Sequence, residues 1–137
     1  LSGRQMGGKQ ERAIDAGKYG SSLDAWMDTG VLVDAGQRLT ITAEGQVDLW
    51  PQGAGQYMAA PKGYNTAGKG GQFLAGALVG RIGDKGKAFL VGERFETNVA
   101  EEGRLFLQII PSPWNNASMG QFRVRINTEP GGLAGRP

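Results

Sequence analysis

Apolar and polar residues alternate with a period of two along several short stretches of the chain. In residues 39–44 the apolar Leu39, Ile41 and Ala43 alternate with polar residues, and residues 122–126 show the same alternation. A period of two that includes β-branched residues is typical of strands that bury one face. The pattern therefore predicts antiparallel strands that pack around a shared core.

Glycine separates these apolar stretches, and the chain contains 24 glycines. The alternating stretches and the glycines between them predict eight or nine short antiparallel strands and no helix. Gly45 is expected to end one strand, and its partner strand follows at residues 47–49. The predicted strands are residues 12–16, 29–33, 39–44, 47–49, 76–83, 88–91, 95–99, 104–109 and 121–126. The predicted core comprises Val31, Leu39, Ile41, Leu78, Ile82, Leu105, Leu107, Phe122 and Val124. This spacing is typical of an all-β sandwich or barrel.

A chain of 137 residues fits one such domain. We divide it into an N-terminal arm or first strand (1–22), a sandwich (23–127) and an irregular C-terminal tail (128–137). The arm is expected to add a strand to a sheet of its own subunit or of a neighbour, because an exposed sheet edge accepts another strand. Pairing with a neighbour would give a homo-oligomer or filament.

Composition removes several classes of function. The chain has no cysteine and no histidine, which excludes thiolate metal sites and a Ser-His-Asp triad. Its net charge is +2 with acids and bases interleaved, so we expect no nucleic-acid partner. The apolar runs are too short for a membrane span. Glu101 and Glu102 are adjacent in a predicted turn rather than across a cleft, so we expect no enzyme.

Residues 51–75 form a long segment that is rich in glycine, proline, alanine and glutamine. It holds Tyr57 and Tyr64 and has little apolar periodicity. Loops of this length inside a compact domain are uncommon and are often functional. A functional loop and a plain insertion both fit this composition.

Four stretches resemble a known family, the small bacterial calcium-dependent galactose-binding lectins (LecA-like, or PA-I galactophilic lectin-like, lectins). They are residues 28–31 with 33–39, the Gly-Ala-Leu-Val…Ile-Gly motif at 76–83, residues 89–92, and residues 103–107 with 115–116 and 120–124. The resemblance implies a jelly-roll sandwich of the galactose-binding-like type. It also implies an exported bacterial protein that acts outside the cell or at its surface, or alternatively in the periplasm.

The chain departs from that family at the residues that hold calcium and sugar. Where the family has an Asn-Asp pair after its Leu-Phe-Leu strand, this chain has Ile110 and Pro111. Asn115 and Asn116 match later asparagine ligands by type, and the family's sugar-contacting histidine is absent. Calcium prefers six to eight oxygen ligands, several of them carboxylates. We therefore expect no tightly bound calcium and no other cofactor.

The predicted carbohydrate site comprises Trp114, Asn115, Asn116, Trp50 and Gln52. Sugar sites combine aromatic faces with amide and hydroxyl partners on loops. Trp114 fits either a ligand platform or an anchor that packs its own loop, Trp50 fits packing better, and Trp26 fits the core. The predicted function is weak, calcium-independent, non-catalytic binding of a galactoside-like glycan. The alternative is a structural subunit of an extracellular bacterial polymer or surface layer.

Overall fold

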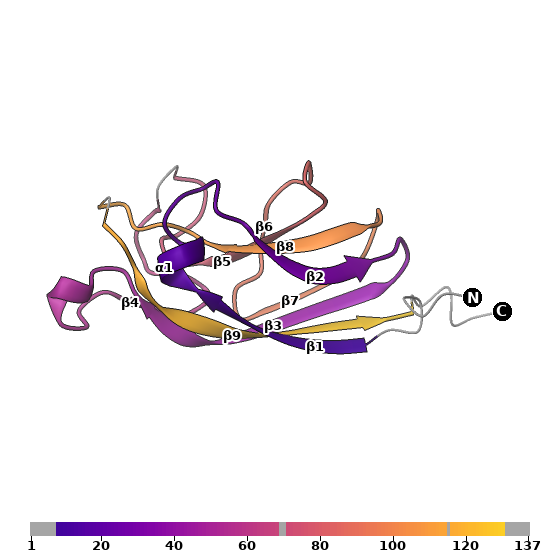
Figure 1. Ribbon diagram of the computed structural model, residues 1–137, viewed down its shortest axis with the longest axis horizontal. Helices are drawn as coiled ribbons and strands as arrows, with labels where there is room; N and C mark the ends of the chain where they lie inside the picture. Colours follow the sequence, from indigo (N-terminus) through magenta and orange to yellow (C-terminus); the bar gives the residue numbers. More distant parts are fainter. Residues whose placement is uncertain (1–7, 69–70, 115, 131–137) are drawn as a thin grey trace.

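The computed structural model describes residues 8–68, 71–114 and 116–130, and it forms a sandwich of two antiparallel sheets (Figure 1). One sheet has the order β1–β9–β3–β4, with β7 also paired to β3, and the other has the order β2–β8–β5–β6. The strands are β1 (Gly8–Asp15), β2 (Met27–Val33), β3 (Arg38–Asp48), β4 (Met58–Ala59), β5 (Leu78–Ile82), β6 (Phe89–Leu90), β7 (Arg94–Asn98), β8 (Gly103–Ile109) and β9 (Met119–Glu129). The predicted all-β sandwich is confirmed.

The prediction of no helix is wrong at one short turn. Helix α1 (Ala16–Tyr19) follows β1 directly, and the Asp15 side chain caps it by accepting a hydrogen bond from the Lys18 N–H at 3.0 Å. A turn of the 3₁₀ type, η2 (Pro51–Gly53), follows β3. In the described ranges no helix is long and apolar enough to cross a membrane.

The core lies between the inner faces of the two sheets. Eight of the nine predicted core residues are buried there, and Ile82 is partly buried against the same cluster. Trp26 is different. It packs with Ala77, Val79 and Ile110 in a second, smaller cluster, on the outer side of the four-stranded sheet. The prediction of Trp26 as a core residue is therefore wrong, because residue 79 faces away from the core that its neighbour Leu78 enters.

The longest ladder of the structure joins β3 and β9. It runs without interruption from Arg38 opposite Glu129 to Asp48 opposite Met119. Gly45, which was expected to end a strand, lies within this ladder with φ +112°. Glycine tolerates that angle, and a Cβ at this position would lie 3.0 Å from the Gln121 carbonyl oxygen. The strand therefore bends at Gly45 and continues to Asp48.

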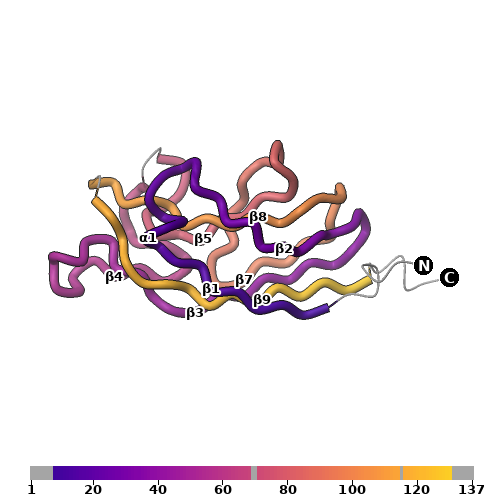
Figure 2. Tube along the Cα trace, viewed as in Figure 1, coloured from indigo at the N-terminus to yellow at the C-terminus, as the bar shows by residue number. Residues whose placement is uncertain are grey.

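Strand β1 pairs with β9 of its own chain along its whole length, and the tubes of the two strands run side by side in Figure 2. Ile14 and Ala16 are fully buried in the core. At the other side of β1, the Arg12 Nε donates a hydrogen bond of 2.8 Å to the Thr29 carbonyl, which links β1 to β2 of the second sheet. β9 continues through Thr128 and Glu129, two residues into the segment predicted to be irregular.

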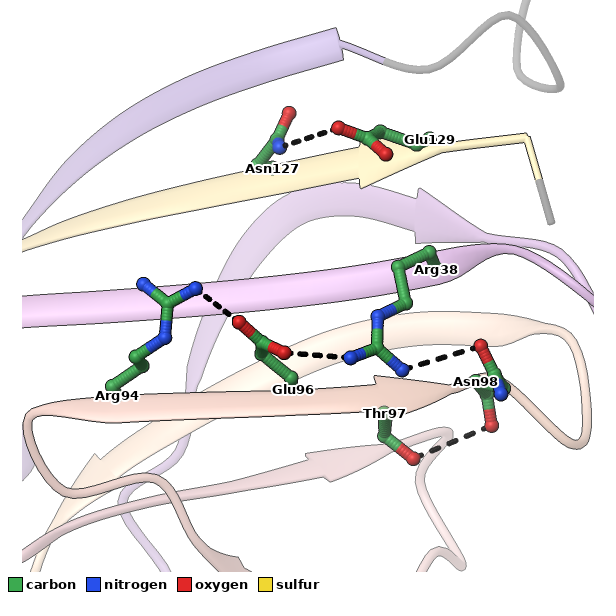
Figure 3. A network of polar contacts seen from close by, with 7 residues as sticks. All are labelled: Arg38, Arg94, Glu96, Thr97, Asn98, Asn127 and Glu129. Atoms are coloured by element: carbon green, nitrogen blue, oxygen red, sulfur yellow. Dashed lines mark hydrogen bonds and ion pairs between the residues drawn. The ribbon is translucent and has the colours of Figure 1, made fainter. Parts of the chain in front are cut away.

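The outer face of the five-stranded sheet carries a network of charged side chains (Figure 3). Glu96 accepts hydrogen bonds from Arg94 and, at 2.6 Å, from Arg38. Arg38 also donates to the Asn98 side chain at 3.4 Å. The Arg94 hydrogen bond, followed by that of Arg38, lowers the pKa of Glu96 below its ordinary value of 4.5.

Titration of Glu96 tests this network. Because its folded pKa is lowered, its stabilising effect is present above the unfolded pKa and is lost as the pH falls through the folded pKa. We expect an NMR titration midpoint below 4.5 that rises in Arg94→Gln. Arg123→Gln, which removes an exposed ion pair to Glu44 on the same face, should leave the midpoint in place. A midpoint that Arg94→Gln does not move would contradict the network.

Removal of the buried part of β1 should destabilise the whole sandwich. Ile14 is fully buried, so Ile14→Ala should lower the free energy of unfolding by about 3 kcal/mol, through lost burial and a residual cavity. Ala13→Ser, on the exposed face of the same strand, should change it by less than about 0.5 kcal/mol. Urea denaturation measures both values, and equal midpoints for the two variants would show that β1 is not integral to the core.

Candidate functional site

The ends of β3 and β9 bring two loops together. Because Asp48 pairs with Met119, the hairpin that follows β3 and the loop that precedes β9 leave the sheet side by side. Figure 1 shows both at one end of the sandwich, opposite the start of β1 and the end of β9. Residues far apart in the sequence therefore meet at this end.

The hairpin between β3 and β4 positions two aromatic side chains. The Asp48 carboxylate accepts a hydrogen bond from the Trp50 N–H at 2.9 Å, which fixes the start of the turn. The Leu49 N–H donates to the Tyr57 carbonyl at 2.9 Å and closes the hairpin. Gly53 leaves room for the Tyr57 ring, since a Cβ there would lie 3.3 Å from a ring carbon.

Four rings then meet, which we call the aromatic cluster: Trp50, Tyr57, Tyr64 and Trp114. The centroids of Tyr57 and Trp114 are 4.9 Å apart, and those of Trp50 and Trp114 are 5.5 Å apart. Tyr57 also lies 6.1 Å from Trp50 and 6.0 Å from Tyr64. The tilted and edge-to-face arrangements are those that aromatic quadrupoles favour, each worth about 0.5–1.5 kcal/mol beyond burial.

The cluster has an inner and an outer part. Tyr57 and Tyr64 are partly buried and pack against the main core. Trp50 is 37% exposed and Trp114 is 36% exposed. The two tyrosines therefore attach the exposed indoles to the sandwich. Trp114 therefore packs its own loop against the cluster and also presents an exposed ring face. The two interpretations of this residue, a loop anchor and a ligand platform, are compatible.

The loop before β9 is held by Asn116. Its Nδ2 donates to the Leu49 carbonyl at 2.6 Å and to the Ala117 carbonyl at 2.9 Å. Its Oδ1 accepts a hydrogen bond from the Ser112 hydroxyl at 3.0 Å, and that hydroxyl oxygen accepts from the Trp114 N–H at 3.1 Å. Asn116 thus ties the Trp114 loop to the end of β3, and most of its hydrogen-bonding capacity is used inside the protein.

The other predicted site residues have different positions. Gln52 is exposed in η2, close in sequence to Trp50. Asn115 lies outside the described residues. Tyr57 and Tyr64 were not predicted as site residues, although they are the aromatic residues of the long segment 51–75. That segment is anchored by β4 and by a bridge between Ala67 and Leu74, so its tyrosines reach the cluster.

The described residues of this site do not fit a calcium ion of the kind that the family resemblance implies. Ile110 and Pro111 are buried and provide no side-chain oxygen where the family has its Asn-Asp pair. The Asp48 carboxylate accepts the Trp50 N–H, and the Asn116 oxygen accepts the Ser112 hydroxyl. Among the described residues, no three acidic side chains gather closely enough to hold a metal ion.

The β-sandwich fold of this chain has a counterpart among solved structures. It is similar to a solved structure described as the EclA N-terminal domain, a PllA-like lectin, with a TM-score of 0.64 and 24% sequence identity. The similarity covers 87% of this chain and 95% of that one. No protein-family model matches the chain, and no curated protein matches it.

Proposed function

We propose that this protein is a non-catalytic carbohydrate-binding domain that acts outside the cell, with the aromatic cluster as its glycan-binding surface. The observation that carries the proposal is the pair of partly exposed indoles, Trp50 and Trp114, whose centroids are 5.5 Å apart. The solved structure with a similar fold is described as a lectin, which supports a carbohydrate-binding role, while the position of the site is argued from the aromatic cluster itself.

An indole is suited to a sugar because a pyranose has an apolar face of C–H groups. The exposed side of Trp114 offers such a face a flat surface, and Trp50, whose ring is tilted by 56° to that of Trp114, adds a second apolar face from the other loop. Burying apolar area on both partners favours binding, and tryptophan loses little conformational entropy. Gln52, which is exposed and two residues from Trp50, would bond sugar hydroxyls.

The surface is held in place before any ligand arrives. Pro111 and Pro113 fix two backbone angles of the loop, and the Asn116 side chain ties the loop to the Leu49 carbonyl. Less conformational entropy is then lost on binding. In this proposal Asn116 is a positioning residue, while Trp50 and Trp114 touch the sugar.

The proposed ligand is a galactoside-like glycan, bound weakly and without calcium. In a calcium lectin the ion coordinates sugar hydroxyls directly, and the loop here lacks the carboxylate that such an ion needs at position 111. Stacking and a few solvent-exposed hydrogen bonds are modest contributions. A dissociation constant of about 1 mM is the expected scale.

Removing one of the two exposed indoles should weaken this binding. Trp114→Ala should weaken retention on a galactoside-bearing glycan array by at least about tenfold, because the stacking surface is lost. Leu90→Ala removes an exposed apolar side chain (48% exposed) from β6 and should bind as the wild type does. Thermal unfolding of each variant shows whether the sandwich remains intact.

Two results would count against the proposal. Equal retention by Trp114→Ala and the wild type would exclude the aromatic cluster as the binding surface. A wild-type domain that binds nothing on a broad array, galactosides included, would remove the glycan-binding function. The structural-subunit alternative would then be the better explanation of the fold.

Calcium should have no effect on this domain. Neutral amide oxygens do not offset the dehydration of a divalent cation as carboxylates do. We expect calorimetric titration with calcium chloride to show no binding at micromolar concentrations, and glycan retention to be the same with and without a chelator. Micromolar calcium binding that Asn116→Ala abolishes would contradict this expectation.

A further inference from the structure

A second candidate site lies on the outer face of the four-stranded sheet, away from the aromatic cluster. Here a cleft of about 250 Å³ opens between the sheet and the segments that cross it. It is lined mainly by apolar side chains: Leu23, Trp26, Phe73, Val79 and Ile110. In Figure 1 the segment that precedes β2 arches over this upper sheet, on the side that faces away from the five-stranded sheet.

Beside this cleft is an arginine without an acceptor. The guanidinium of Arg81 lies 4.6 Å from the ring centroid of Trp26 and 4.9 Å from that of Phe106. Its Nε is buried and has no hydrogen-bond partner. Within the described part of the chain, Arg81 forms no hydrogen bond or ion pair at all. The two rings hold the cation but leave its N–H donors unused.

The sheet register places this cation next to the cleft. Val79 pairs with Gln108 and Arg81 pairs with Phe106, so the two pairs are successive on the outer face. Trp26 belongs to both features, since it lines the cleft and contacts Arg81. Asp28, which pairs with Phe106 from the other side, does not neutralise Arg81, because its carboxylate accepts from Arg104 and from the Gly30 N–H.

The cleft also has one polar acceptor in its wall. Gln108 is 2% exposed, and its Nε2 donates to the Ser22 carbonyl at 3.1 Å. These contacts fix the amide so that Oε1 remains as an acceptor, and no described residue donates to it. A buried polar group without a partner is rare in native structures, and beside this cleft that group is the Arg81 Nε rather than the Gln108 amide oxygen.

We propose that this cleft binds a small organic carboxylate that has an apolar ring. The planar guanidinium of Arg81 would pair with the carboxylate, for which its fork geometry is suited. The ring would occupy the apolar cleft, and a donor on the ligand would bond Gln108 Oε1. An apolar cavity of about 150 Å³ binds benzene, so a cleft of about 250 Å³ accommodates a substituted ring.

The test compares indole-3-acetate with its neutral isostere indole-3-acetamide on the whole chain, by NMR. We expect indole-3-acetate to shift the Trp26 indole N–H and the Arg81 Nε–H signals, and the amide to bind at least about tenfold more weakly. Arg81→Gln should weaken binding of the carboxylate by a similar factor. Arg123→Gln, which removes an exposed arginine from the five-stranded sheet, should leave it unchanged.

Each other outcome overturns the proposal. Equal affinity for the two probes would show an apolar cleft without a carboxylate site, and no shift with either probe would show that Arg81 only braces the two rings. If Arg81→Gln does not fold, Arg81→Lys keeps the charge and loses the fork, and it should also weaken binding. This test is separate from that of the glycan surface. Galactosides should move the NMR signals of Trp50 and Trp114 and leave the Trp26 signal in place.

Discussion

The pairing of β3 with β9 is the constraint on which the rest of the structure depends. Each strand is eleven residues long, and every residue of one is paired with a residue of the other. The ladder gives β1 and β7 their partners, and the inner sides of both strands supply core residues such as Ile41 and Val124. At its far end it fixes the distance between two loops that are more than 60 residues apart in sequence. The position of the aromatic cluster is therefore a consequence of strand register.

Strand register also explains why the Asn116 side-chain amide can hold the two loops together. The ladder ends at Asp48 and Met119, so Leu49 and Asn116 lie just beyond the last pair. The Asn116 side chain continues the connection with its 2.6 Å bond to the Leu49 carbonyl. Backbone groups that leave a sheet lose their ladder partners and must find others. Here a side chain supplies the partner, and the same contact holds Trp114 against Trp50.

Period-two alternation was enough to predict the sandwich, and eight of the nine predicted core residues are buried, because burial of one strand face is a local pattern. It failed where the deciding contact is distant. Gly45 reads as a break, yet its pairing partner lies on β9 and keeps the strand continuous. Trp26 was predicted as a core residue, yet it packs against Val79. The side chain of Val79 points to the outer face of its strand, so Trp26 lies outside the main core. Trp50 and Trp114 were found from residue type, whereas Tyr57 and Tyr64 needed the folded hairpin to join them.

The two candidate sites differ in what the protein leaves unsatisfied. Around the aromatic cluster the polar groups are largely paired internally, and the exposed surface is apolar ring, which suits a neutral ligand with its own hydroxyls. On the other sheet a guanidinium is held by two rings without any acceptor, which suits an anion. A neutral sugar would provide no anion for Arg81, and a small carboxylate would gain no charged partner at the aromatic cluster. The two proposed sites would therefore select different ligands, because one lies at the loop end beyond β3 and β9 and the other on the outer face of the four-stranded sheet.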